Sequence, residues 1–139
     1  MPVTEILIVD DFPFWQHFVA TLLESETDFK IISAASDGLE AVQKAKELQP
    51  DVILMDVSLP GLSGIEATRE IRKLCSGSKI LFLSEHRCPD FIRAAFDAGG
   101  SGYVLKSDSG SDLIPGIRAI LNGRQFVSNC LRDWRALFN

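Results

Sequence analysis

Acidic residues, a serine and a lysine each follow a short apolar run of this chain. Asp10 and Asp11 come directly after the first run, Asp56 after a second, Ser84 after a third and Lys106 after a fourth. Together they offer a carboxylate nucleophile, a hydroxyl hydrogen-bond donor and a positive charge. If these runs end at one edge of a sheet, the cluster has the groups that phosphoryl transfer to a carboxylate requires.

A cluster of three carboxylates needs a cation. Two carboxylates about 5 Å apart repel by about 3 kcal/mol even at an effective dielectric near 20. Oxygen ligands without a suitably placed His or Cys favour a hard ion, and Mg²⁺ suits a few carboxylates, waters and a phosphoryl group. Asp56 is the candidate nucleophile, because it stands between the other groups on a central strand.

The elements that must position these residues alternate between strands and helices. β-branched runs mark the strands, and apolar residues at i, i+3 and i+4 mark the helices between them. The predicted strands are Glu5–Val9, Lys30–Ala34, Val52–Met55, Lys79–Leu83 and Gly102–Leu105. This pattern predicts an α/β fold, a (βα)5 doubly wound five-stranded parallel sheet covered on both faces. Such sheets bind ligands beyond the carboxyl ends of their strands.

Prolines and weak periodicity bear on where the helices begin. Pro13 suits the first turn of a helix that follows Asp11. Pro115 is predicted to lie in the first turn of a helix that Asp112 caps. The helix near Asp90–Ala98 has the weakest pattern of the series.

Composition and charge exclude several classes of protein. The 139 residues, 46% of them hydrophobic, suit one globular domain, and the net charge of −5 disfavours direct contact with nucleic acid. The apolar runs are far shorter than the roughly 20 residues of a membrane span, and no signal peptide precedes them. We therefore expect a cytoplasmic protein without a membrane partner. The cysteines are odd in number and lack paired spacing, which disfavours a disulfide framework or a zinc site.

Some residues also have a plainly structural interpretation. Asp10 and Asp11 suit the N-terminal end of a helix by charge and hydrogen bonding. His17 and His86 have no companion ligand and are expected at the surface. Trp15 fits the first helix, either packed against the core or at an edge that faces a partner.

Four stretches of this chain together resemble the receiver domain of two-component response regulators. They are, in order, Ile6–Asp11, Asp51–Gly64, Ile80–Ser84 and Gly102–Lys106. The resemblance covers about residues 4–123 and implies the flavodoxin-like receiver fold with strand order 2-1-3-4-5. Residues 102–123 look most like the NarL/LuxR-type branch, whose members usually carry a helix-turn-helix domain after a linker.

The resemblance implies a phosphorylation-dependent signalling switch in transcription regulation, a phosphoacceptor domain rather than an enzyme. Asp56 would accept a phosphoryl group from a histidine kinase or a phosphotransfer protein, with self-catalysed phosphorylation and dephosphorylation as its own chemistry. The implied Mg²⁺ ligands are Asp10, Asp11, Asp56 and the backbone carbonyl of Ser58. Lys106 would contact the phosphoryl group, and Ser84 and Tyr103 would relay the change to an output surface. Members of this branch commonly form homodimers.

The resemblance also divides the chain. Residues 1–123 are predicted to form the receiver domain, and residues 124–139 a tail or the start of a linker to an output domain outside this sequence. In that tail Leu131, Trp134 and Phe138 have roughly helical spacing. This spacing fits either a packing helix or the first turns of a linker helix.

Two positions depart from the family pattern. Glu85 follows Ser84 where related receivers commonly have a small residue, which predicts altered phosphorylation kinetics. Ser107 follows Lys106 where many receivers have proline, which leaves the geometry of that peptide bond open.

Other functions remain as alternatives. A phosphatase of the haloacid-dehalogenase type needs a second acid two residues after the nucleophile, where this chain has Ser58. A flavodoxin-like FMN binder needs a Ser/Thr-rich loop after the first strand, where this chain has Asp10–Pro13. A pseudo-receiver that serves only as an interaction module is disfavoured, because all the site residues are present.

Overall fold

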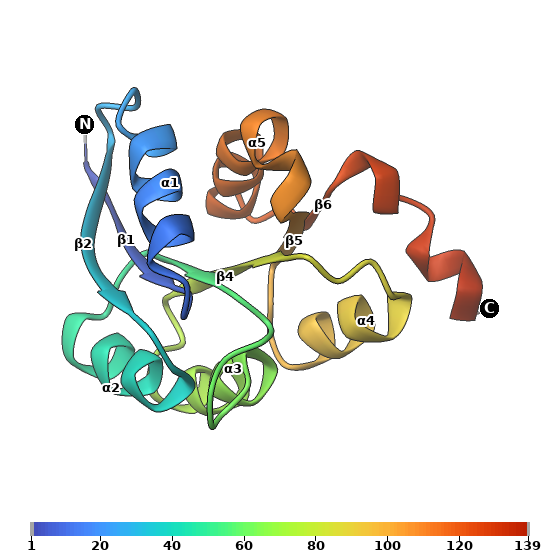
Figure 1. Ribbon diagram of the computed structural model, residues 1–139, viewed down its shortest axis with the longest axis horizontal. Coiled ribbons are helices and arrows are strands. Elements are labelled where there is room, and N and C mark those ends of the chain that lie inside the picture. The colour runs from blue at the N-terminus through green and yellow to red at the C-terminus, as the bar shows by residue number, and fades with distance from the viewer. Residues whose placement is uncertain (1, 139) are drawn as a thin grey trace.

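The computed structural model describes residues 2–138, which form a parallel sheet between two layers of helices (Figure 1). The six strands lie in the order β2-β1-β3-β4-β5-β6. They are β1 Thr4–Val9, β2 Phe29–Ala35, β3 Val52–Met55, β4 Lys79–Ser84, β5 Gly102–Leu105 and β6 Phe126–Val127. The α-helices are α1 Pro13–Leu23, α2 Gly38–Leu48, α3 Gly64–Leu74, α4 Pro89–Asp97 and α5 Ser109–Leu121. Short 3-10 helices are η1 Lys106–Asp108, η2 Asn129–Leu131 and η3 Trp134–Phe138.

The central strands are buried on both faces. In β3, Ile53 and Met55 belong to one core cluster, whereas Val52 and Leu54 belong to the other. Helices α1 and α5 cover one face of the sheet, and α2, α3 and α4 cover the other (Figure 1). Because both sets of alternate residues are buried, these strands are continuous apolar runs rather than alternating ones.

The strand order brings the ends of β1 and β3 together. From β1 the chain first runs outward to β2 and then returns past β1 to form β3, so the order reverses between these two neighbours. Such a reversal opens a crevice beyond the carboxyl ends of the two strands. Asp10 directly follows β1 and Asp56 directly follows β3.

The predicted five strands and their order, 2-1-3-4-5, are confirmed, but the sheet has a sixth strand. The two residues of β6 pair in parallel with Gly102 and Tyr103 of β5. Beyond them, the Ser128 hydroxyl accepts a hydrogen bond from the Leu105 N–H at 2.9 Å. A strand this short has no periodicity in the sequence, and its place is set by the free edge of β5.

The tail packs as 3-10 turns rather than as the predicted α-helix. Leu131 is 8% exposed and joins the core beneath α4. The Trp134 ring stacks on Phe96 of α4 with centroids 5.6 Å apart. These contacts explain the apolar spacing of the tail, although the side chain of Phe138 lies outside the part that the structure describes.

The start of α5 differs from the prediction. The helix follows η1 directly, so Asp112 lies in its first turn rather than at its N-cap, and Pro115 lies inside the helix. The buried Ser109 hydroxyl donates to the Lys106 carbonyl at 2.8 Å, which holds the chain in a turn before the helix. This tertiary arrangement overrides the weak helix propensity of the serines and glycine at its start. Pro13 does lie in the first turn of α1, as predicted.

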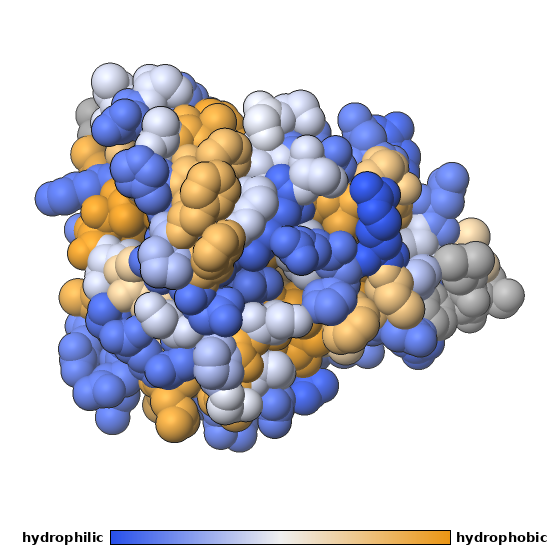
Figure 2. Space-filling model, in the orientation of Figure 1, coloured by the Kyte–Doolittle hydropathy of each residue, from blue (hydrophilic) through white to orange (hydrophobic). Residues whose placement is uncertain are grey.

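An apolar strip covers α1 on the face shown in Figure 2, where Phe12, Phe14 and Phe18 are exposed. The rings of Phe14 and Phe18 stack with centroids 6.3 Å apart. Among residues 2–138, no helix combines the length and the apolar character that crossing a bilayer requires.

Candidate functional site

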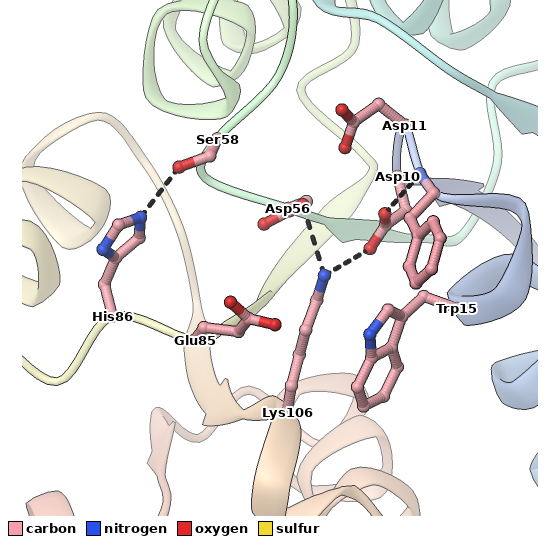
Figure 3. A pocket seen from close by; sticks show the side chains of 9 residues that line it. Asp10, Asp11, Trp15, Asp56, Ser58, Glu85, His86 and Lys106 are labelled. Atoms are coloured by element: carbon pink, nitrogen blue, oxygen red, sulfur yellow. Dashed lines mark hydrogen bonds and ion pairs between the residues drawn. The ribbon is translucent and has the colours of Figure 1, made fainter.

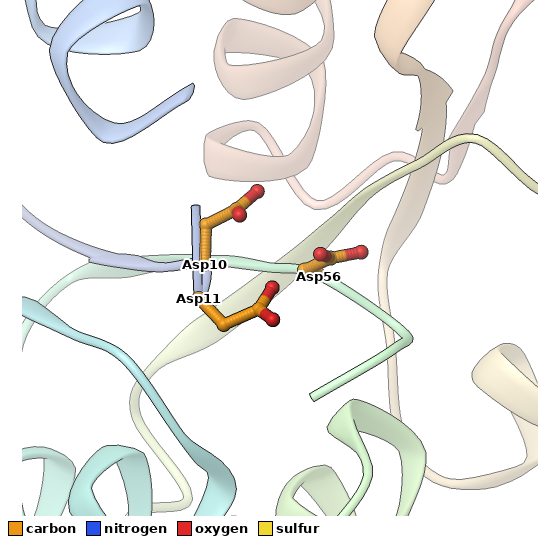
Figure 4. Close-up of side chains that lie close together, drawn as sticks. All are labelled: Asp10, Asp11 and Asp56. Carbon is orange, nitrogen blue, oxygen red and sulfur yellow. The ribbon is translucent and has the colours of Figure 1, made fainter. Parts of the chain in front are cut away.

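Three aspartates meet at the carboxyl ends of β1 and β3 (Figure 4). One carboxylate oxygen from each of Asp10, Asp11 and Asp56 lies within 4.8 Å of the other two. Asp10 and Asp56 are 4% and 7% exposed, whereas Asp11 is at the surface. Two buried carboxylates this close repel each other unless cations compensate them.

Lys106, at the end of β5, supplies one compensating charge. Its Nζ lies 2.7 Å from Asp10 Oδ2 and 3.3 Å from Asp56 Oδ2, and its side chain is 6% exposed. Burial lowers the pKa of Lys106, but the hydrogen bond to Asp10 and the charge of Asp56 outweigh it, so the pKa is raised overall. The ammonium group therefore stays charged at neutral pH. The Trp15 ring, with its centroid 5.0 Å from Nζ, lies against the same group.

Asp56 is the carboxyl group whose protonation is most affected by the site. Burial raises the pKa of Asp56 to about 6, the nearby Lys106 ammonium opposes this rise, and the charge of Asp10 adds to it. Lys106 alone thus does not fully compensate the charge of Asp56. A second cation at the cluster would stabilise the ionised form.

Asp10 has a local role as well as a place in the cluster. Its Oδ1 accepts a hydrogen bond from the Phe12 N–H at 2.9 Å, at the entrance to α1. The N-cap of α1 is Phe12 itself, which has no side-chain cap. The capping interpretation of Asp10 is therefore partly right. The hydrogen bond from Phe12 holds Oδ1 in place, while Oδ2 faces Lys106.

Ser84 and Tyr103 are fully buried behind the cluster. The Ser84 hydroxyl accepts a hydrogen bond from the His86 N–H at 3.1 Å, and the Tyr103 hydroxyl donates to the His86 carbonyl at 2.9 Å. Burial raises the pKa of Tyr103, against a hydrogen bond with Ser84, so the hydroxyl remains a donor at neutral pH. The Tyr103 ring already lies inside the protein, packed near Phe82.

The cluster opens into a pocket of about 260 Å³ (Figure 3). Its lining residues are Asp10, Asp11, Phe12, Trp15, Asp56, Ser58, Glu85, His86 and Lys106. Glu85 is exposed, and Figure 3 draws its carboxylate turned toward the interior of the pocket. Glu85, which the sequence analysis singled out for its effect on kinetics, thus lies in the lining of the pocket beside the three aspartates.

His86 is the site residue that sequence reasoning missed. It was expected at the surface, yet its Nε2 lies 2.7 Å from the Ser58 hydroxyl across the pocket lining. Its position two residues after Ser84, at the carboxyl end of β4, was a usable signal. The rule that places ligands beyond strand ends applies to His86 as it does to its neighbours.

The donor set suits a hard divalent cation. It consists of the carboxylate oxygens of Asp10, Asp11 and Asp56, with the Ser58 hydroxyl in the same pocket lining and no histidine or cysteine within the acidic cluster. The incompletely compensated charge of Asp56 points to the same conclusion. The arrangement can hold a cation and a phosphoryl group between Asp56 and Lys106.

Comparisons with known proteins agree with this geometry. The profile of the response regulator receiver domain matches residues 6–118. The chain is 38% identical over 118 residues to the transcriptional regulatory protein LiaR of Bacillus subtilis, covering 85% of this chain and 56% of the relative. It is 31% identical to the transcriptional regulatory protein DegU of Brevibacillus brevis, covering 97% of this chain and 59% of the relative. The chain thus spans less than two thirds of the length of these curated relatives.

Solved structures give the same match. A two-component response regulator of the LuxR family from Aurantimonas sp. is 37% identical with a TM-score of 0.92, and the match covers 98% of this chain and 97% of that one. The response regulator domain of CheB from Thermotoga maritima is 32% identical with a TM-score of 0.80, and the match covers 86% of this chain and 97% of that one.

Proposed function

Because this chain belongs to the family of response regulator receiver domains, we propose that Asp56 accepts a phosphoryl group with the help of a bound Mg²⁺ ion. The observation that carries the proposal is the convergence of three carboxylates and Lys106 at the carboxyl ends of β1, β3 and β5. The proposed donor is a histidine kinase or a phosphotransfer protein. The chain is thus a signalling domain, and its relatives LiaR and DegU are transcription regulators.

The residues of the site have separate parts in the proposed reaction. A carboxylate oxygen of Asp56 attacks phosphorus, the bond from phosphorus to the donor breaks, and the leaving group departs with the electron pair of that bond. Lys106 moves from neutralising Asp56 to binding a phosphoryl oxygen. Attack by water on phosphorus later releases phosphate and restores the carboxylate. Both steps would be self-catalysed, without turnover of a separate substrate.

The proposed Mg²⁺ ligands are Asp10, Asp11, Asp56 and the backbone carbonyl of Ser58. When bound, the ion neutralises charge that builds up on the phosphoryl oxygens. Asp10 would act partly through water, since one of its oxygens faces Lys106. The acidic cluster and the raised pKa of Asp56 support this ligand set.

The experiment that tests the proposal is a mass measurement. The protein is incubated with acetyl phosphate and Mg²⁺, and we expect a gain of one phosphoryl group, followed by slow loss after the donor is removed. Omitting Mg²⁺ should prevent the gain. A mass that stays unchanged under all conditions would support the pseudo-receiver alternative instead, and steady hydrolysis of a phosphomonoester would support the phosphatase.

Mg²⁺ affinity should depend on pH through Asp56. The metal binds the ionised carboxylate, and the pKa of Asp56 in the metal-free protein is about 6. Affinity should be nearly constant above pH 7 and fall by about tenfold per pH unit well below pH 6 as a proton competes with the ion. Calorimetric titration with Mg²⁺ at several pH values between about 5 and 8 measures this dependence of affinity on pH. A flat profile would contradict the role of Asp56 as a ligand.

Ser84 is proposed to relay phosphorylation to the surface around α4 and β5. We expect Ser84→Ala to accept the phosphoryl group but to lose most of the accompanying change at Tyr103, because the hydroxyl that binds a phosphoryl oxygen is absent. The Tyr103 ring is already buried, so the change should concern its hydroxyl contact. NMR shifts of Tyr103 report it, with the exposed Ser111→Ala as control. Equal shifts in both variants and wild type would reject the relay.

Glu85 is proposed to slow the approach of phosphodonors. It adds a negative charge at a pocket that already holds three acids, and acetyl phosphate is itself negative. Glu85→Ala should therefore accelerate phosphorylation by roughly two- to fivefold at low salt and less at high salt. Loss of the phosphoryl group should also become faster, because the side chain restricts the line of water attack. Glu85→Gln separates charge from size, and unchanged or slower rates in the alanine variant would refute the idea.

Further features of the protein are proposed from its relatives in the receiver family. The tail, residues 124–139, is proposed to begin a linker toward an output domain, as the greater length of LiaR and DegU suggests. Homodimer formation through this domain and a cytoplasmic location are proposed because the chain belongs to the receiver family. With a net charge of −5, the receiver itself is not expected to contact DNA.

A further inference from the structure

The side chain of His86, which lines the pocket, joins the segment after β3 to helix α4. Its Nε2 lies 2.7 Å from the hydroxyl of Ser58, which belongs to the segment after β3. Its ring stacks on Phe91, in the first turns of α4, with centroids 4.3 Å apart and an interplanar angle of 19°. The imidazole therefore contacts both the segment after β3, through Ser58 (Figure 3), and helix α4, through Phe91.

The backbone of His86 is bonded to both residues of the proposed relay. Its N–H donates to the Ser84 hydroxyl at 3.1 Å, and its carbonyl accepts from the Tyr103 hydroxyl at 2.9 Å. A shift of the His86 backbone would alter both hydrogen bonds at once. What holds this backbone in place therefore matters to the relay.

Ser58 lies where binding of a metal ion or a phosphoryl group at the Asp56 site would affect its position. It lies two residues after Asp56, its hydroxyl binds His86, and it lines the pocket that holds the acidic cluster. If the segment after β3 moves when the metal or the phosphoryl group binds, the hydrogen bond between the Ser58 hydroxyl and His86 Nε2 would move the imidazole with it. The imidazole would pass this displacement to Phe91 and to the segment before α4.

We infer that the Ser58–His86 hydrogen bond positions the segment 85–88 and carries the state of the Asp56 site to α4, as a second connection beside Ser84. His86 is thus a positioning residue that acts through its neighbours. The inference rests on the proposed function, because it assigns regulation of the same site. It requires that removing either partner of the bond has the same effect on α4.

The first test uses the metal-free protein and amide hydrogen exchange in residues 85–97. The variants are Ser58→Ala, His86→Phe, which keeps an aromatic ring against Phe91, and the double variant. Each single change should weaken protection by about two- to tenfold, the effect of one hydrogen bond on a local opening equilibrium. The double variant should lose no more than either single one, because both remove the same bond. His17→Phe is the matched control, since His17 is exposed on α1 away from the pocket lining.

The second test adds Mg²⁺ and beryllium fluoride, which mimics a phosphoryl group on a carboxylate. In wild type these ligands should change exchange in α4, and in both single variants most of that change should disappear. Additive effects of the two substitutions, unchanged protection, or an equal effect of His17→Phe would overturn the inference. Failure of the wild-type protein to gain a phosphoryl group from acetyl phosphate would instead overturn the proposed function, whatever the exchange data in metal-free protein.

Discussion

Asp56→Asn is expected to abolish phosphorylation by acetyl phosphate in the presence of Mg²⁺. The amide oxygen is a far weaker nucleophile than the carboxylate, and the substitution also removes a charged metal ligand. Intact-mass measurement over the time in which wild type is fully modified provides the comparison. Asp97→Asn, a change of the same kind at an exposed position on α4, should be modified at the wild-type rate.

The same substitution should make the metal-free protein more stable at neutral pH. The pKa of Asp56 is raised from 3.8 to about 6 in the folded chain, so protonation favours the folded state. That contribution is complete below about pH 4 and is lost as pH rises through about 6. At pH 7.5 the ionised carboxylate therefore costs stability, and Asn should restore about 1–3 kcal/mol.

Urea denaturation in EDTA at pH 7.5 and at pH 4 measures the effect on stability, which should nearly vanish at the lower pH. A modified Asp56→Asn protein would show that another residue accepts the phosphoryl group. An asparagine variant less stable than wild type at both pH values would show that the buried carboxylate stabilises the fold rather than serving the site.

Among the variants for which we predict a change in stability, Lys106→Met is expected to lose the most. The ammonium group lies 2.7 Å from Asp10 and 3.3 Å from Asp56, all three side chains being 6–8% exposed. Removing one member of a buried ion cluster leaves uncompensated charge, which typically costs about 3–5 kcal/mol. Urea denaturation at pH 7.5 in EDTA should show this loss. Lys73→Met, at a lysine 72% exposed and paired with Glu70, is the control and should change little.

Lower pH and Mg²⁺ should each restore part of the stability that Lys106→Met loses. Lys106 lowers the pKa of Asp56, so in its absence that pKa rises further and Asp56 takes up a proton more readily as the pH falls. Mg²⁺ would replace the missing positive charge but not the contact to the phosphoryl group, so phosphorylation should remain slow. A variant as stable as wild type at pH 7.5 without metal would show that the lysine is not needed to compensate the aspartates.

The sequence by itself determined the fold class and the members of the acidic site. Continuous β-branched runs indicate strands buried on both faces, and parallel strands place the residues that follow them at one edge. Asp10, Asp11, Asp56 and Lys106 could therefore be assembled from their positions after four runs, and the structure brings these four together. Local sequence is sufficient here because burial and strand direction depend on short, strong patterns.

Only the tertiary structure decided the contacts that local patterns do not encode. The two residues of β6 pair with a free sheet edge, and the beginning of α5 follows a turn held by buried Ser109. His86 became a site residue because the loop after β4 faces the loop after β3, 28 positions earlier in the chain. Likewise, the pKa of Asp56 depends on burial and on the distances to Asp10 and Lys106. Such properties arise from groups brought close in space by the whole fold, and no stretch of sequence contains them.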